Sequence, residues 1–464
     1  MMELAGKKIC VVSLGCARNV VDSEKILGDM LAAGGRRARL DQAQTVILNT
    51  CGFTEEAKRE SLEALEELLR RKRNGRLNAV YVAGCLVQRY RKELAAAFPE
   101  VDDFGGLADF KTVFPAQARL TAGPTAFVKI CEGCANPCTY CAIPYIKGRL
   151  RSRPQAAVLK EVRALEAQAV REINIVGQDI TLYGLERGTD ARGLPLVRLL
   201  KALLKHTRIP WIRLLYLHPQ RMTDELVDLI AAEPRVCSYV DVPFQHASTR
   251  ILRLMGRRMT RAEVFALVEK LRRRIPAAAV RTTFIVGFPG ETKRDFRELC
   301  DAVTHLRFDR MGVFMYSREE GTRAYGLKGQ VTARVKRERM DHLMRLQAEV
   351  SRRNLRQDVG RRLDVLIETP GRGAGACLTH PEGHVHEGAE AWPSGGIPPQ
   401  GRKTKRGGAK AVSLWGYIGR SYKDAPEVDG VVRVASRRPL EAGDIVACRI
   451  TSSSTHDLSG ELLP

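Results

Sequence analysis

The N-terminal part of the chain alternates between short apolar runs and longer amphipathic stretches. The apolar runs at 9–14, 45–48 and 79–82 are rich in β-branched residues, as buried strands are. The stretches at 23–33 and 55–70 between them place apolar residues at helical spacing. This alternation predicts a parallel sheet whose strands are joined by helices.

The same alternation repeats over a longer segment, from 126 to about 322. Strands are predicted at 127–130, 173–176, 212–217, 239–242, 280–286 and 313–316. Helices are predicted at 158–167, 224–232, 262–274 and 294–305. Polar or glycine-rich residues follow the strands, as they do at the functional rim of a βα barrel. We therefore expect a barrel built from six strands rather than eight.

The C-terminal segment has a third pattern. A charged amphipathic helix is predicted over 333–358, followed by β-rich blocks at 363–367 and 413–450. Short strands separated by turn signals predict a small antiparallel barrel. Between the blocks, 370–410 is rich in Gly, Pro and His, and we expect a disordered insertion there. The patterns together predict α/β domains at 1–115 and 120–355 and a β-barrel domain at 356–464.

Composition adds expectations about the surroundings of the protein. The formal charge of +23 over 464 residues indicates a polyanionic neighbour such as RNA or a ribosome. No apolar run reaches membrane-spanning length, and the N-terminus lacks a signal-peptide core. We therefore expect a cytoplasmic protein whose 12 cysteines serve as ligands and thiols rather than as disulfides.

Four cysteines stand close together after the first strand of the predicted barrel. Cys134, Cys138 and Cys141 have C-x3-C-x2-C spacing, and thiolate is the natural ligand of an iron–sulfur cluster. Cys131 precedes them, so the run also fits a closed four-thiolate zinc or ferredoxin-like site. The polar rim of the barrel favours a catalytic iron–sulfur site, because a structural zinc site needs no such rim.

Three more cysteines follow the N-terminal strands in the same phase. Cys16, Cys51 and Cys85 each come just after one predicted strand. The carboxyl ends of parallel strands meet at one edge of a sheet, so we expect these thiols to converge. A strand often ends in a small buried cysteine, but three in phase favour a second iron–sulfur cluster.

Together these features resemble the methylthiotransferase branch of the radical S-adenosylmethionine (SAM) enzymes. The resemblance covers nearly the whole chain except 370–410. It implies an α/β architecture with a flavodoxin-like N-terminal domain, a six-stranded partial TIM barrel and a C-terminal TRAM-like antiparallel β-barrel. It further implies two [4Fe–4S] clusters, the first held by Cys16, Cys51 and Cys85 and the SAM-binding one by Cys134, Cys138 and Cys141. Cys131 stands where the family is expected to have a small residue that is not a ligand.

The resemblance also implies how the two clusters share the reaction. One SAM molecule methylates a sulfur held at the first cluster, and a second, cleaved at the other cluster, gives the radical that removes a hydrogen from the substrate carbon. Both clusters therefore have to face one cavity. The candidate SAM contacts are Tyr140, Gln178, Asp179, Gln245 and Glu291. Asp179 and Glu291 are equally well explained as loop or helix-cap residues.

Local strings indicate the substrate. Those at 49–53, 213–217, 243–248, 316–322 and 419–430 resemble the ribosomal-protein branch of the family; Gln245-His-Ala-Ser248, for example, replaces the Gln-Ser-Gly-Ser typical of tRNA-modifying relatives. They imply methylthiolation of the β-carbon of an aspartate in a small-subunit ribosomal protein. The radical chemistry that the resemblance implies needs an electron donor such as a flavodoxin or ferredoxin, and a contact with rRNA stays open. The alternative is a tRNA methylthiotransferase that acts on the adenosine next to the anticodon, since the two branches share fold and clusters.

Overall fold

The structure is a computed structural model that describes residues 5–105, 118–121, 123–188, 194–369 and 415–464. It divides into two compact units, Met1–Val350 and Ser351–Pro464. The expected insertion at 370–410 lies outside the described residues. Among the described helices, none combines the length and the apolar character that crossing a membrane requires.

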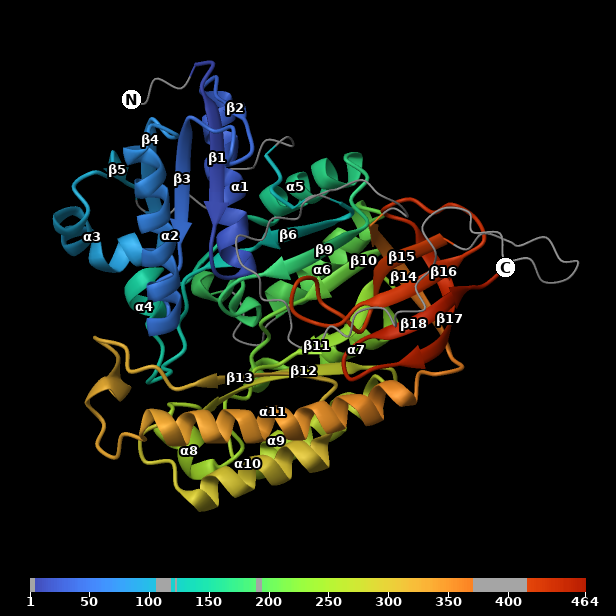
Figure 1. The fold of residues 1–464 in the computed structure, drawn as a ribbon. Coiled ribbons are helices and arrows are strands. Elements are labelled where there is room, and N and C mark those ends of the chain that lie inside the picture. The colour runs from blue at the N-terminus through green and yellow to red at the C-terminus, as the bar shows by residue number, and fades with distance from the viewer. Residues whose placement is uncertain (1–4, 106–117, 122, 189–193, 370–414) are drawn as a thin grey trace, which may run out of the picture. The chain divides into compact units, whose positions relative to one another are not determined.

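A five-stranded sheet begins the first unit (Figure 1). The strand order is β2–β1–β3–β4–β5, and every neighbouring pair is parallel. The strands are β1 (Lys8–Ser13), β2 (Arg36–Arg37), β3 (Thr45–Thr50), β4 (Ala79–Gly84) and β5 (Asp103–Phe104). All residues of β3 are buried, as expected for a central strand of a parallel sheet that is covered on both faces.

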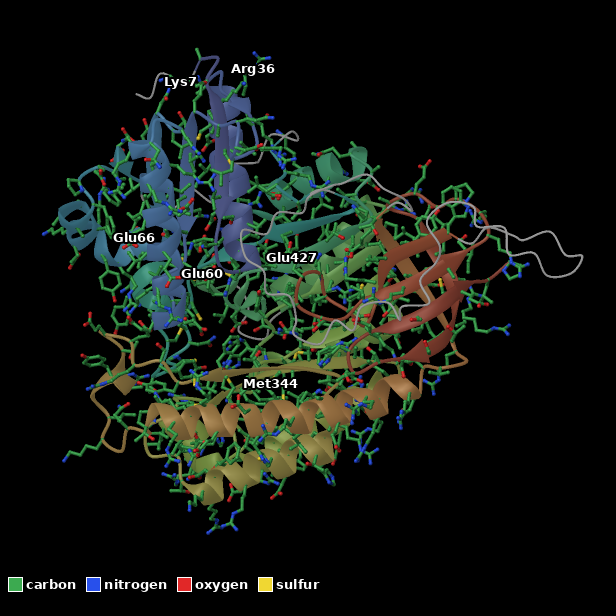
Figure 2. All side chains as sticks on the ribbon, viewed as in Figure 1. Lys7, Arg36, Glu60, Glu66, Met344 and Glu427 are labelled. Atoms are coloured by element: carbon green, nitrogen blue, oxygen red, sulfur yellow. The ribbon has the colours of Figure 1, made fainter. Side chains whose placement is uncertain are left out.

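Helices α1 (Ala17–Ala32), α2 (Glu55–Arg73) and α3 (Cys85–Ala97) follow β1, β3 and β4. The start of α2 is determined locally, because the Thr54 side chain accepts a hydrogen bond from the Ala57 amide and acidic residues occupy the first turn. Lys7 and Arg36 mark the amino ends of the strands, and Glu60 and Glu66 lie on α2 (Figure 2). The carboxyl ends of the strands therefore form the opposite edge, which carries the cysteines.

A second parallel sheet of six strands follows, in the order β13–β12–β11–β10–β9–β6. Its strands are β6 (Thr125–Lys129), β9 (Glu172–Val176), β10 (Trp211–Leu214), β11 (Val236–Asp241), β12 (Ala279–Val286) and β13 (Arg310–Met315). Its main helices are α5 (Gln155–Ala167), α6 (Leu194–His206), α7 (Asp224–Ala232), α9 (Arg261–Arg274) and α10 (Lys293–Leu306). This arrangement is the predicted six-stranded partial barrel, and the largest hydrophobic core lies between these strands and helices.

Shorter elements shape the rim of this barrel. They are the two-stranded sheet β7 (Cys131–Glu132) and β8 (Arg151–Ser152), the helices α4 (Ile143–Ile146) and α8 (Thr249–Leu254), and the 3-10 turns η1 (Ile180–Leu182), η2 (Leu185–Arg187), η3 (Pro219–Arg221) and η4 (Arg323–Gly326). The longer helices α9 and α10 begin with capping boxes, Thr260 with Glu263 and Thr292 with Asp295. These caps give both helices sharp starts, within one residue of the predicted ones.

The second unit contains a closed five-stranded barrel in the order β14–β15–β16–β18–β17. Helix α11 (Ala333–Arg356) precedes it, and the strands are β14 (Arg362–Thr369), β15 (Trp415–Ser421), β16 (Val432–Ser436), β17 (Ile445–Ser453) and β18 (Leu458–Leu462). Four pairings are antiparallel as predicted, whereas β16 and β18 pair in parallel. The pattern did not reveal β18, because it reads Leu-Ser-Gly-Glu-Leu and only Leu458 and Gly460 are buried.

Candidate active site

The first cysteine trio lies at the carboxyl edge of the N-terminal sheet. Cys16 and Cys51 come just after β1 and β3, and Cys85 follows β4 as the first residue of α3. Burial and the nearby thiols of Cys16 and Cys85 raise the pKa of Cys51 to about 12. Burial raises the pKa of Cys85 to about 11, and the Cys16 thiol acts in the same direction. The three thiols therefore influence one another's ionisation, as expected for side chains gathered at one edge of the sheet.

Small and polar neighbours make this convergence possible. Gly15 has a φ of +90°, and a Cβ there would lie 2.8 Å from the Cβ of Cys51. Asn19 ties the loops together, because its Nδ2 donates to the carbonyl oxygens of Leu14 (2.8 Å) and Thr50 (3.0 Å). The thiol of Cys85 in turn donates to Asn19 Oδ1 at 3.7 Å. The loops after all three strands are thus fixed to one another.

The second trio lies in the loop between β7 and α4. Burial and the thiols of Cys138 and Cys134 raise the pKa of Cys141 to about 12, which places these three thiols close together. The loop is anchored to the barrel rim at Thr139, which donates from its amide to Met255 O (2.9 Å) and from its hydroxyl to Leu254 O (2.8 Å). The geometry therefore supplies a three-thiol site held by the barrel.

Cys131 occupies a different environment from the trio that follows it. It is fully buried in the hydrophobic core, and its thiol donates to the carbonyl oxygen of Asp179 at 3.7 Å. Cys134, Cys138 and Cys141 are each partly exposed. Within the described residues, no three Cys, His, Asp or Glu side chains converge on a single-ion site. A four-iron cluster binds each thiolate through a separate iron, so its ligands need not converge on one point.

The Arg18 side chain, on α1, contacts the first trio and acts electrostatically on both. Its Nε donates to Cys16 Sγ at 3.2 Å, and its guanidinium carbon lies 4.6 Å from the centre of the Tyr216 ring. Burial alone would raise the pKa of Cys16, but the charge and hydrogen bond of Arg18 lower it below its ordinary value. The same charge acts on the thiols of Cys51, Cys85 and Cys141. The charge of Arg18 therefore acts on thiols of both trios.

Two residues at the carboxyl ends of barrel strands have a left-handed backbone. Tyr216, just after β10, has a φ of +64°, and Gln245, after β11, has a φ of +73°. The Tyr216 amide donates to Asp241 Oδ2 at 2.9 Å, and Asp241 in turn pairs with Arg281 at 3.0 Å. A left-handed backbone at a bulky residue stores strain, and such strain concentrates at functional sites. Here it aims the Tyr216 ring at Arg18.

Four buried charges connect the two cysteine loops. Asp22, on α1, contacts Lys129 and lies 2.9 Å from Lys147, and both lysines contact Glu132, at 2.5 and 3.5 Å. Each side chain is at most 5% exposed. Burial opposes ionisation of Glu132, but the two lysines lower its pKa to about 2. We call this group the buried tetrad; it holds the helix after Cys16 against the segments that flank the second trio.

Comparisons with known proteins place the chain among its relatives. Family profiles match an uncharacterized protein family, UPF0004, at 8–106, the radical SAM superfamily at 128–303 and the TRAM domain at 412–463. The chain is 40% identical to the ribosomal protein uS12 methylthiotransferase RimO of Citrifermentans bemidjiense, with 100% of both chains covered. It is 38% identical to the RimO of Symbiobacterium thermophilum, with 99% of this chain and 92% of that one covered.

The chain belongs to the RimO family of radical SAM methylthiotransferases. Among solved structures, the radical SAM methyltransferase TsrM of Kitasatospora setae matches at 17% identity and a TM-score of 0.49, over 67% of this chain and 73% of that chain. That likeness is too distant to carry an argument. The full-length RimO relatives and the radical SAM profile identify the family.

In this RimO-family chain, two of the five candidate SAM contacts are carboxylates that pair with arginines. Asp179 caps η1 by accepting from the Thr181 amide (3.0 Å), and it also pairs with Arg221. Glu291 accepts from the Phe288 amide (3.1 Å) and pairs with Arg339 (3.1 Å). Asp179 and Glu291 thus make the loop and helix-cap contacts that the sequence analysis gave as the alternative to binding SAM. Their SAM role stays a prediction.

The other three candidates are uncharged side chains on or near the barrel rim. Tyr140 OH accepts from Arg257 at 3.2 Å, and burial raises its pKa well above its ordinary value. Gln178 Nε2 donates to Glu132 at 2.9 Å, while its Oε1 is buried without a hydrogen-bond partner among the described residues. Gln245 is paired through its backbone to Thr283 and Ile285, both at 2.8 Å. Their contacts with SAM also stay predictions.

Sequence reasoning missed Arg18, Tyr216 and the buried tetrad. Arg18 stands two positions after Cys16, which was the available signal, because a cation so near a cluster ligand affects its charge. Asp22 and Lys129 are separated by 107 residues in the chain, so no local pattern joins them. Tyr216 lies inside the string at 213–217, but nothing in that string predicts a left-handed backbone.

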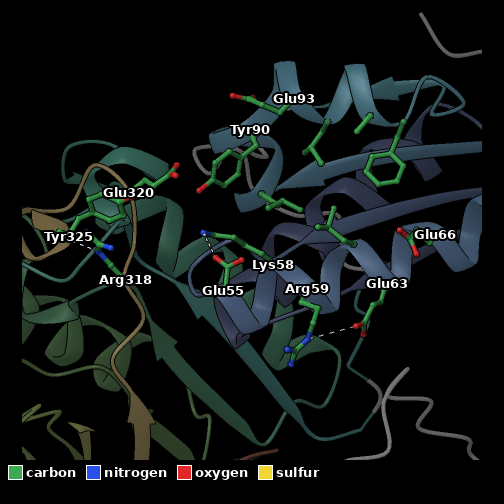
Figure 3. Close-up of a pocket in the computed structure, with 15 residues that line it drawn as sticks. Glu55, Lys58, Arg59, Glu63, Glu66, Tyr90, Glu93, Arg318, Glu320 and Tyr325 are labelled. Carbon is green, nitrogen blue, oxygen red and sulfur yellow. Dashed lines mark hydrogen bonds and ion pairs between the residues drawn. The ribbon is translucent and has the colours of Figure 1, made fainter. Parts of the chain in front are cut away.

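A separate groove of about 980 Å³ lies along α2, α3 and the segment after β13 (Figure 3). Leu62, Leu86 and Phe98 are among its apolar residues, and glutamates are frequent among its polar ones. Lys58 pairs there with Glu55 at 3.0 Å. The residues that line the groove include neither trio nor any candidate SAM contact. The groove is therefore distinct from the active site.

Proposed function

We propose that this chain attaches a methylthio group to the β-carbon of an aspartate in ribosomal protein uS12. The observation that carries the proposal is that the buried tetrad joins the loops of the two cysteine trios, so that groups bound at the trios would lie near one another, with Arg18 bonded to Cys16 at 3.2 Å. The relatives matched over the full length are uS12 methylthiotransferases. Their names favour the aspartate substrate over the anticodon adenosine.

The residues present suit two iron–sulfur clusters. Each trio supplies three thiols, the donor type that such clusters select, and a fourth thiol is not needed where one iron stays open to SAM. The proposed ligands are Cys16, Cys51 and Cys85 for the first cluster and Cys134, Cys138 and Cys141 for the second. When bound, the clusters and SAM supply the electron, the radical that removes hydrogen, and the methylated sulfur.

The protein itself positions these groups and excludes water. The β-hydrogen of aspartate has no useful acidity, so the site needs placement more than a general base. Asn19 fixes the first trio and Thr139 the second, while the buried tetrad holds the two loops together. Such a closed setting protects a reactive radical from solvent.

Further parts of the proposal concern SAM and the domains. We assign Tyr140, Gln178, Asp179, Gln245 and Glu291 to the SAM site, supported by their places beside the second trio and on the barrel rim. We also assign domains to 1–115, 120–355 and 356–464. The three family profiles each fall within one of these ranges, which supports the boundaries.

We also propose the partners of the reaction. A flavodoxin or ferredoxin supplies the electron, and uS12 is met in the cytoplasm, within the ribosome. The formal charge of +23 supports a contact with rRNA, since a strongly basic chain attracts polyanions.

A competition experiment tests the function. The reconstituted chain is given SAM, sulfide and reductant under anaerobic conditions, with uS12 and an anticodon stem-loop RNA in the same tube. We expect mass spectrometry to find the methylthio mass gain on one uS12 aspartate and not on the RNA. A gain on the RNA alone would contradict the proposal and move the chain to the tRNA branch.

A further inference from the structure

Arg18 is a cation enclosed between the two trios. Its side chain retains some accessible surface, although burial opposes its charge. Its contacts are the thiol of Cys16 at 3.2 Å and the face of Tyr216 at 4.6 Å. Among the described residues, no carboxylate pairs with it. Arg18 thus carries a positive charge whose one charged side-chain contact among the described residues is the Cys16 thiol, with no carboxylate to pair with its remaining donors.

Other cations near the trios are held by protein groups, and Arg257, beside the second trio, donates to the Tyr140 hydroxyl at 3.2 Å. Arg281 pairs with Asp241 at 3.0 Å, and both lysines of the buried tetrad contact Asp22 and Glu132. A guanidinium has five N–H donors, and only the Nε of Arg18 is used, in the bond to Cys16. The guanidinium carbon lies 4.6 Å from the centre of the Tyr216 ring, and this contact limits the movement of the remaining donors. They form a fork of the kind that binds a carboxylate.

The proposed substrate needs such a group. The reacting β-carbon of an aspartate is bonded directly to its carboxylate, so the carbon cannot enter an enclosed space without bringing that charge along. An ionised carboxylate is costly to bury unless an opposite charge and hydrogen-bond donors compensate it. An adenine base carries no such charge and requires no cation.

We propose that the Nη donors of Arg18 bind the carboxylate of the substrate aspartate and so select aspartate over neutral side chains. This inference rests on the proposed function. Tyr216 acts as a positioning residue, because its ring holds the plane of the guanidinium while its amide is fixed by Asp241.

Binding affinity provides the test. A fluorescent peptide with the modified loop of uS12 is prepared with either Asp or Asn at the target position, and its Kd for the reconstituted enzyme is measured with SAM present. We expect the wild type to bind the Asp peptide about 10- to 100-fold more tightly, the worth of one or two charge-assisted hydrogen bonds. Arg18→Met should bind both peptides with the same weak affinity.

Two further variants make this result interpretable. Arg18→Lys keeps the charge but loses the fork, and it should retain part of the preference for Asp. If Arg18→Met fails to fold or to hold iron, Arg18→Lys still decides, because an undiminished preference in that variant would contradict the fork. Arg59→Met is the matched control, since Arg59 is 70% exposed on α2 and its removal deletes the same charge from a solvent-exposed position.

Three outcomes would overturn the inference. Equal binding of the Asp and Asn peptides by the wild type is the first. The second is an Asp preference that survives in Arg18→Met while only the cluster's spectroscopic signature is lost, which would make Arg18 a partner of the cluster alone. The third is a loss of SAM affinity in Arg18→Met as large as the loss of affinity for the Asp peptide, which would mean that Arg18 binds SAM and not the substrate. If the wild type modifies the Asp peptide in any of these cases, the proposed function stands and only this inference fails.

Discussion

A cysteine joins a cluster site only when its strand or loop turns the thiol toward the other ligands. The strand phase predicted this for Cys16, Cys51 and Cys85, and the structure brings their thiols together. Spacing alone left Cys131 open as a fourth ligand, because spacing does not say which way a side chain points. Its burial in the core beside the Asp179 carbonyl is a tertiary feature.

This difference among the cysteines of the barrel is testable. Cys138→Ala should lose the second cluster, so that bound iron falls by roughly half and SAM is no longer cleaved. Cys131→Ala is the matched control and should keep both the iron and the cleavage, at a modest cost in stability. Appreciable 5′-deoxyadenosine from Cys138→Ala, or loss of iron from Cys131→Ala, would contradict the ligand assignment.

The first trio has a different role, and a second variant separates it from the other. Cys51→Ala should still cleave SAM reductively, because the barrel cysteines are intact. It should insert no sulfur, because the first cluster is incomplete. The two products, 5′-deoxyadenosine and the methylthiolated peptide, are measured in the same reaction by mass spectrometry. Full methylthiolation would mean that the N-terminal thiols are only structural.

Individual helices and strands were the most predictable level of the fold. Helix α7 has the predicted bounds, because apolar residues at helical spacing follow the N-cap Thr223. Strand β18 and its parallel pairing with β16 were not predicted, since its register is set by a partner strand and not by its own pattern. Contacts between elements, such as the one between Asp22 and Lys129, were not predicted either, because each depends on a partner that lies far away in the sequence.

The buried tetrad predicts the outcome of changing one carboxylate on α1. Asp22→Asn leaves two buried lysines facing Glu132 alone, and an uncompensated buried charge of this kind costs about 3–5 kcal/mol in the free energy of unfolding. The measurement is denaturant unfolding of the two proteins.

Asp29→Asn is the control on the same helix. Asp29 pairs with Lys25 at 2.7 Å but is 63% exposed, so its loss should cost about 0.5 kcal/mol or less. Equal destabilisation by the two changes would show that the tetrad contributes no more than a surface ion pair.

Across the whole first unit, Glu319 ties the segment after β13 to the helices of the N-terminal sheet. It lies 2.8 Å from Lys58 on α2 and 2.7 Å from Arg89 on α3, and its side chain is 3% exposed. Burial opposes its charge, but hydrogen bonds from Lys58, Ser317 and Arg89 lower its pKa. Neither the charge count nor any local motif indicated this contact, because its members lie more than two hundred residues apart.

This contact should make the stability depend on pH. Because the pKa of Glu319 is lower in the folded state, its contribution is present above the unfolded value of about 4.3 and is lost as the pH falls below it. Glu319→Gln should therefore lower the free energy of unfolding by roughly 1–3 kcal/mol at pH 7 and by less at pH 4. Glu55→Gln removes an exposed partner of Lys58 and should change little at either pH. A loss for Glu319→Gln that stays constant with pH would contradict this account.

The charges of the buried tetrad are divided between the N-terminal part, which contains α1, and the barrel, and this division limits how well either part can be replaced. Asp22 brings one negative charge from α1, whereas Lys129, Glu132 and Lys147 together bring one positive charge from the barrel side. Neither part is neutral at this contact without the other. A graft of the N-terminal sheet onto a foreign barrel would therefore need a receptor with the complementary charge, however well the surfaces matched in shape. The N-terminal sheet and the barrel therefore cannot be exchanged independently, because a replacement for either one has to carry the matching buried charge.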